Sequence, residues 1–257
     1  MSDSTDRYYR TLAVDYAVTI RQLVPRYDEM LETITALVQL LAVQGRASGM
    51  AAPAARSASG TVSDGGVRSD CQVLDIGAGS GEVSALLLSR HADVRITALE
   101  PSAAMVEVLR ARLAAWSDRV RIEATDALHF ATARPFAAVV SNLVLHNLGN
   151  RDKRRVLRNI TRMLAPGGAF VWGDMIVQSD ARLQRGVIAE RTRHARAAGC
   201  DEALIVENFR KEAEDDSPWT IHDTLVALRR AGFRDVDCAW SAGAFAIFTA
   251  RRKGKRP

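Results

Sequence analysis

A glycine-rich loop that follows an apolar strand is the strongest chemical signal in the sequence. Residues 73–76 read Val-Leu-Asp-Ile, and glycines follow at positions 77, 79 and 81. Glycine tolerates the positive φ angles of a tight strand-to-helix turn, and it has no side chain to keep a ligand away from the backbone. We therefore expect this loop to hold a nucleotide-like cofactor, with Asp75 accepting charge-assisted hydrogen bonds from a cationic amine.

The spacing of the loop argues against a dinucleotide site. The fingerprint G-x-G-x-x-G would place its third glycine one residue later than Gly81, and it requires no acid before the first glycine. Residues 82–90 continue with the apolar spacing of a helix that can face a sheet.

A second acid ends the next predicted strand. Residues 94–99 alternate as a strand does, and Glu100 and Pro101 follow. In doubly wound sheets a carboxylate at this place accepts hydrogen bonds from ribose hydroxyls, and ligands bind beyond the carboxyl ends of the strands. The alternative is that Glu100 is an ordinary surface glutamate. Its spacing along the sequence from the glycine loop, about one strand-helix unit, favours a ribose contact.

Together, these motifs resemble the class I, Rossmann-like family of S-adenosylmethionine (SAM)-dependent methyltransferases. The resemblance covers roughly residues 71–176, and residues 73–81 match the motif D-x-G-x-G-x-G. It implies an α/β fold with a doubly wound, mostly parallel seven-stranded sheet whose last strand is antiparallel, and SAM as cofactor. The residues that it assigns to the cofactor are Asp75, Gly77, Ala78, Gly79, Gly81, Glu100, Pro101, Met105, Asp126, Ala127, Asn142 and Leu143.

Methyl transfer requires the acceptor to be aligned and, for some acceptors, a proton to be removed. His146, just past the fourth predicted strand, is the best-placed base, because the ordinary pKa of histidine is about 6.5. A histidine here can also serve only as a wall of the pocket. Tyr27 is a second catalytic candidate, and Tyr16, His146 and Arg210 are candidates for binding the acceptor. The alternative for either tyrosine is packing on an amphipathic helix.

Helical segments flank the predicted sheet. We expect a helical cap over residues 1–45 with a break before Pro25, a flexible linker over 46–70, and a SAM-binding domain over 71–257. A helical insertion after the fifth strand, at about residues 181–216, is too long for an ordinary loop and predicts a lid. Asp174 in the fifth strand is expected to face the pocket or solvent.

The composition of the chain indicates which kinds of binding partner are expected. The net charge is +5, and residues 251–256 alone carry five basic side chains, so the rest is balanced and nucleic acid is an unlikely partner. No apolar run approaches 18 residues and no leader is evident, which favours a cytoplasmic protein without membrane attachment. The three cysteines lack C-x-x-C spacing, so we expect no metal site. The oligomeric state stays open, a homodimer included.

Three interpretations of the function remain. A methyltransferase acting on a small molecule is favoured, since the fourth strand ends in Ser141-Asn142-Leu143 and lacks the N-P-P-Y sequence of enzymes that methylate DNA bases. The layout also resembles the carboxy-SAM synthase branch, whose product serves tRNA modification. The third is a SAM-binding regulatory or partner protein without catalysis.

Overall fold

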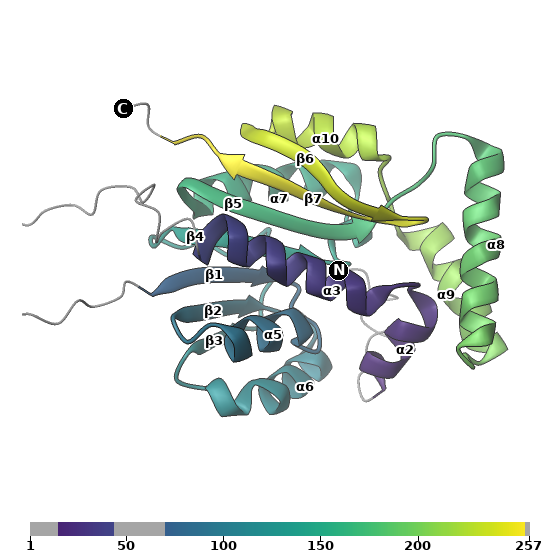
Figure 1. Cartoon of the computed structure of the whole chain (residues 1–257), viewed down its shortest axis with the longest axis horizontal. Coiled ribbons are helices and arrows are strands. Elements are labelled where there is room, and N and C mark those ends of the chain that lie inside the picture. Colours follow the sequence, from purple (N-terminus) through teal and green to yellow (C-terminus); the bar gives the residue numbers. More distant parts are fainter. Residues whose placement is uncertain (1–14, 44–69, 255–257) are drawn as a thin grey trace, which may run out of the picture.

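The computed structural model describes residues 15–43 and 70–254 (Figure 1). Its strands are β1 (Cys71–Ile76), β2 (Val94–Leu99), β3 (Val120–Glu123), β4 (Phe136–Asn142), β5 (Leu164–Met175), β6 (Phe233–Ala242) and β7 (Phe245–Arg252). Its α-helices are α2 (Tyr16–Leu23), α3 (Tyr27–Val38), α5 (Glu82–Arg90), α6 (Ala103–Leu113), α7 (Asn150–Met163), α8 (Ala181–Ala197), α9 (Glu202–Asp215) and α10 (Ile221–Arg230). Short turns of other helix types are η1 (Gln39–Val43), η2 (Ala114–Trp116) and η3 (Leu145–Asn147).

The seven strands form one sheet in the order β3-β2-β1-β4-β5-β7-β6. The strands from β1 to β5 pair in parallel, and β7 runs antiparallel to both β5 and β6. Six strands therefore share one direction and β7 opposes them, which confirms the predicted α/β fold. The order reverses between β1 and β4, so the carboxyl ends of these strands form the crevice where such sheets bind ligands.

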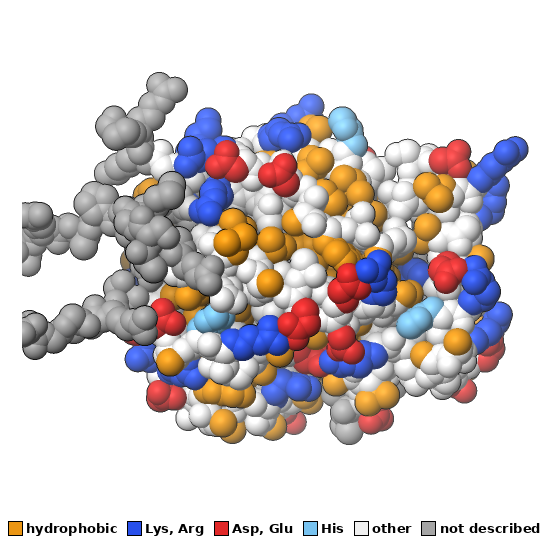
Figure 2. All heavy atoms as spheres, viewed as in Figure 1, with side chains coloured by type: hydrophobic (Ala, Val, Ile, Leu, Met, Phe, Trp, Pro, Cys, Tyr) orange, Lys and Arg blue, Asp and Glu red, His pale blue; other side chains and the backbone are white. Residues whose placement is uncertain are grey.

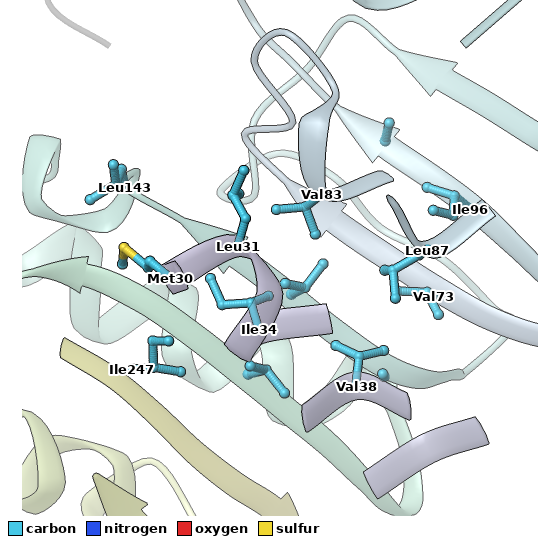
Figure 3. Packing of buried hydrophobic residues seen from close by; sticks show 14 of the residues in the cluster. Met30, Leu31, Ile34, Val38, Val73, Val83, Leu87, Ile96, Leu143 and Ile247 are labelled. Atoms are coloured by element: carbon cyan, nitrogen blue, oxygen red, sulfur yellow. The ribbon is translucent and has the colours of Figure 1, made fainter. Parts of the chain in front are cut away.

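Both faces of the sheet are covered by helices, and the central strands are accordingly apolar on both sides. Val73 packs in a cluster with α3 and α5, whereas its neighbour Leu74 packs in a second cluster with α7 and α10. Helix α3 runs along the sheet in Figure 1, and Figure 3 shows Met30, Ile34 and Val38 directed at it. These three side chains have no exposed surface, so the N-terminal helix belongs to the core.

The N-terminal segment breaks where the sequence indicated. Helix α2 ends at Leu23, Pro25 lies between the helices, and Arg26 adopts a left-handed conformation with φ of 60° before α3 begins. The remainder of the predicted cap, and the predicted linker apart from Asp70, lie outside the described residues.

Acidic side chains cap the turn after β3 and the helices of the insertion. Strand β3 ends at Glu123, and the Asp126 carboxylate then caps a turn by accepting from the backbone N–H groups of Leu128 and His129 at 2.9 and 3.1 Å. The insertion at 181–216 consists of two helices. Asp180 and Asp201 cap them through backbone N–H groups, as short acidic side chains do at helix starts.

Candidate active site

A cleft of about 820 Å³ opens at the carboxyl ends of β1, β2 and β4. Most residues predicted to hold the cofactor line it, namely Gly77, Gly79, Glu100, Pro101, Met105, Asp126, Ala127, Asn142 and Leu143, together with Tyr16 from α2. We call it the first cavity.

The three loop glycines have different roles, although all have positive φ angles of 66°, 54° and 82°. A Cβ added to Gly77 would lie 2.5 Å from the Val144 side chain, and one added to Gly81 would lie 2.6 Å from Leu109. These two positions allow close packing within the protein. A Cβ on Gly79 would meet nothing nearer than 3.8 Å, so this glycine leaves room at the cavity wall.

Hydrogen-bonding groups at the first cavity suit an adenosine-type ligand. Glu100 is only 6% exposed, and its two carboxylate oxygens accept from the backbone N–H groups of Gly79 and Ser102, each at 2.9 Å. A carboxylate is an acceptor to which ribose hydroxyls can donate. The Oδ1 atom of Asn142 is buried without a hydrogen-bond partner among the described residues. A bound cofactor would supply the donor that this oxygen lacks.

Asp75, Ala78 and Gly81 do not line the first cavity. The Asp75 carboxylate is buried beneath the loop and accepts from the Ser84 hydroxyl at 2.6 Å. Burial raises its pKa to about 6, partly opposed by the Ser84 hydrogen bond, and the nearby Glu100 raises it further. In this structure Asp75 ties the loop to α5. A direct contact between its carboxylate and a ligand amine stays a prediction.

A second cavity of about 530 Å³ shares Tyr16 and Leu143 with the first. Its other walls come mainly from α2, α8, α9 and η3, so the insertion lines this cavity, and Figure 1 shows α8 and α9 beyond the carboxyl ends of the strands. Burial and the carboxylates of Glu100 and Glu82 raise the pKa of Tyr16, so its phenol stays protonated. Leu143 has φ of 57°, a strained value for a non-glycine residue, at the wall between the cavities.

His146 lines the second cavity, and its imidazole and backbone are hydrogen-bonded to Asp174. Its Nδ1 hydrogen-bonds Asp174 Oδ1, and its backbone N–H donates to Asp174 Oδ2 at 3.0 Å. Asp174 is 2% exposed and also accepts from Trp172 Nε1 at 2.8 Å. The expectation that Asp174 faces the pocket or solvent is therefore wrong, since this carboxylate lies under the imidazole. The arrangement orients His146 as carboxylates orient catalytic histidines.

The insertion adds charged side chains, of which sequence reasoning missed Lys211, Glu212 and Asp216. Asp216 Oδ2 lies 3.8 Å from His146 Nε2, and Lys211 donates to Asp216 Oδ1 at 2.9 Å. Arg191 pairs with both oxygens of Glu212 at 2.7 and 2.8 Å. Although burial raises the pKa of Glu212, Arg191 outweighs it and the net pKa is lowered. No local motif marks these residues; only the packing of α8 and α9 brings them to the cavity.

Two predicted site residues lie elsewhere. Tyr27 lines neither cavity, and its hydroxyl donates to Glu82 Oε2 at 3.1 Å, so its catalytic role stays a prediction without a contact that supports it. Arg210 is half exposed and pairs on the surface of α9 with Glu207 and Glu214, and its acceptor-binding role likewise stays a prediction. Helical periodicity does not show which turn of a helix faces a cavity.

Within the part of the chain that the structure describes, no group of three or more metal-binding side chains occurs and no helix is long and apolar enough to cross a membrane. Figure 2 shows positive and negative side chains interspersed over the face that carries α3, without a field of one sign.

The sheet order, the glycine loop and the acid after β2 together define the fold and cofactor site of class I SAM-dependent methyltransferases. Comparison with known proteins agrees. Residues 73–168 match the family described as methyltransferase domain. The matched residues therefore form a methyltransferase domain with the class I fold, and the cofactor that such domains use is SAM.

Individual relatives cover different shares of the chain. An uncharacterized methyltransferase of Bacillus licheniformis is 32% identical over 114 residues, which are 44% of this chain and 51% of that protein, so the chain spans about half of this relative. A carboxy-S-adenosyl-L-methionine synthase of Klebsiella pneumoniae is 26% identical over 194 residues, 74% of this chain and 78% of that protein. The solved DhpI-SAM-HEP complex has a TM-score of 0.57 at 18% identity, covering 99% of this chain and 97% of that chain. At that identity it shows the shared fold alone.

Proposed function

We propose that this protein transfers the methyl group of SAM to a small-molecule acceptor held in the second cavity, with His146 as general base. The observation that carries the proposal is that the two cavities share Tyr16 and Leu143. A donor in one and an acceptor in the other would meet at this shared wall, which is the alignment that methyl transfer needs.

Bound SAM supplies a methyl group already activated by its sulfonium. The protein then has to bind, orient and move a proton. The loop backbone at Gly77 and Gly79 gives the cofactor room to approach, Glu100 would accept from its ribose hydroxyls, and Asn142 Oδ1 would accept from a cofactor N–H group. Met105, Pro101, Asp126 and Ala127 would complete the walls.

The second cavity has chemical requirements for its ligand. The Nε atom of Arg191 and the Oδ2 atom of Asp216 are both buried without hydrogen-bond partners among the described residues. An acceptor that offers a hydrogen-bond acceptor to Arg191 and a donor to Asp216 would satisfy both atoms. Its nucleophile would give its proton to His146 Nε2 as its lone pair forms the bond to the methyl carbon and the carbon–sulfur bond breaks.

The test is calorimetric titration of the protein with SAM and S-adenosylhomocysteine, followed by a screen of small polar acceptors with release of S-adenosylhomocysteine as the readout. We expect binding of both cofactor forms and a methylated product. Binding of SAM without turnover of any acceptor, combined with a cofactor-dependent protein complex, would instead support the regulatory interpretation.

A carboxy-SAM synthase is the second candidate. It is favoured by the relatives of that name, which match both chains over long ranges, 74% and 78% for the Klebsiella protein. Mass spectrometry of the small molecule that co-purifies with the protein separates the candidates: SAM or S-adenosylhomocysteine supports methyl transfer, and a carboxylated SAM supports the synthase.

A nucleic-acid substrate has less support. The tRNA1(Val) (adenine(37)-N6)-methyltransferase of Phocaeicola vulgatus is 39% identical, but over 72 residues that make up 27% of this chain. On the one face that Figure 2 shows, positive and negative side chains are mixed, so this face differs from the basic face that phosphate contacts require.

A further inference from the structure

The side chain of Asn147 connects His146 to the insertion. Lys211 on α9 donates to Asn147 Oδ1 at 2.8 Å. The Nδ2 atom of the same amide donates to the backbone carbonyl of Val144 at 3.1 Å and lies 3.2 Å from His146 Nε2. One amide thus contacts a lysine on one side and the imidazole on the other.

The chemistry of lysine decides how this amide is oriented. An ammonium group has donors and no acceptor, so it requires the oxygen of the amide, and the Val144 carbonyl requires the nitrogen. The reverse orientation would place Nδ2 donors against the Lys211 ammonium and Oδ1 against a carbonyl. Lys211 is itself fixed by Asp216, and its side chain is only 7% exposed.

The amide orientation in turn decides which nitrogen of His146 carries the proton. Because Asn147 presents an N–H donor to Nε2, this nitrogen must accept. The proton of the neutral ring is then on Nδ1, where the Asp174 carboxylate accepts it. We propose that Lys211 and Asn147 are positioning residues that hold His146 in the tautomer with a bare Nε2 facing the second cavity.

The inference deepens the proposed function, since a base must present a lone pair to the acceptor. It also gives the insertion a role beyond covering the site. The lysine that selects the tautomer lies on α9, so the base is prepared only when α9 is packed against η3. An acceptor proton would replace the Asn147 contact at Nε2.

The test is long-range ¹H–¹⁵N correlation spectroscopy of the imidazole rings in the full-length protein at neutral pH. The spectrum of His146→Gln identifies the His146 signals. We expect a protonated Nδ1 and an unprotonated Nε2 in the wild type. In Lys211→Met the amide can rotate, and we expect this single-tautomer pattern to be lost.

Two further variants make the test specific. In Asn147→Asp, both side-chain oxygens are acceptors, so one can still accept from Lys211 while the other accepts from Nε2; we expect a proton on Nε2. Arg210→Met, one position from Lys211 but on the exposed side of α9, is the matched control and should keep the wild-type pattern.

A wild-type ring protonated at Nε2 would overturn the proposal, and so would an unchanged pattern in both Lys211→Met and Asn147→Asp. The spectra need neither cofactor nor acceptor. The tautomer assignment can therefore stand while a methyl-transfer assay fails, or fail while methyl transfer is observed, so the two proposals are tested separately.

Discussion

The two cavities are built in different ways. Apart from Tyr16, every residue that lines the first cavity comes from one stretch, Ile76 to Val156, and the loop glycines contribute little beyond backbone. The second cavity draws its walls from α2, the segment after β4 with η3, the helices α8 and α9, and the ends of β5 and β7. A donor site made of strand ends can serve many acceptors, because changes in the surrounding helices leave it intact.

The two cavities also differ in their polar groups. The two carboxylates that line the first cavity, Glu100 and Asp126, accept hydrogen bonds from backbone N–H groups, and the Asn142 amide oxygen has no hydrogen-bond partner among the described residues. The second contains two buried ion pairs, Arg191 with Glu212 and Lys211 with Asp216. Buried pairs contribute more to a defined arrangement than to stability, so we expect the second cavity to carry selectivity.

The largest expected effect is a loss of turnover, caused by a change in the second cavity, without a loss of SAM affinity. Replacing His146 with Gln should lower turnover by about 10² to 10⁴-fold, the usual contribution of a general base, while SAM affinity stays at the wild-type value. Steady-state kinetics with a screened acceptor and calorimetry measure the two quantities. His222→Gln, on the exposed side of α10, is the control. Equal losses of turnover and SAM affinity would contradict the separation.

Asp75 allows a test of the support beneath the first cavity. The pKa of its carboxyl is about 6 in the folded chain and 3.8 ordinarily, so the native state binds the proton more tightly between these values. The free energy of unfolding should then fall by about 3 kcal/mol as pH rises through this window.

Asp75→Asn cannot titrate but can still accept from Ser84, so its stability relative to wild type should rise from pH 4 to pH 7. Urea unfolding of both proteins across this range measures the difference. A difference independent of pH would mean that Asp75 is already solvated.

Gly79 tests whether the loop approaches the cofactor. Its Cβ would meet no protein atom within 3.8 Å, so Gly79→Ala should fold yet lose SAM affinity by about 100-fold, or ~2.7 kcal/mol. Gly167→Ala is the matched control, since Gly167 has φ of 77° and nothing within 4 Å of an added Cβ. It carries similar backbone strain away from both cavities. Titration calorimetry should find normal SAM affinity in the control; equal losses would assign the effect to strain.

The smallest effect is expected on the outer side of α9. Arg210→Ala should leave turnover and the KM for the acceptor unchanged, because its ion pairs are exposed and lie away from both cavities. Kinetics of this variant check the boundary of the second cavity. A raised KM would show that the cavity extends further along α9 than its walls indicate.

Sequence patterns predicted the fold and most of the residues that line the first cavity, because these residues belong to local motifs. The glycine loop and Glu100 lie at strand ends, where a local motif also determines position in space. His146 follows β4 directly and was found for the same reason. Tyr27 and Arg210 lie away from both cavities. An aromatic or charged residue on a helix can face several neighbours, and the sequence does not identify them.

Local sequence was sufficient for the sheet, the loop and the cofactor, since strand periodicity, glycine conformation and a terminal acid act over a few residues. The tertiary structure alone decided the partners of His146. Asp174 lies 28 positions away along the chain, and Lys211 lies 64 positions from Asn147. Their meeting depends on the pairing of β4 with β5 and on the docking of α9, and long-range packing of this kind leaves no periodic signal in the residues that it brings together.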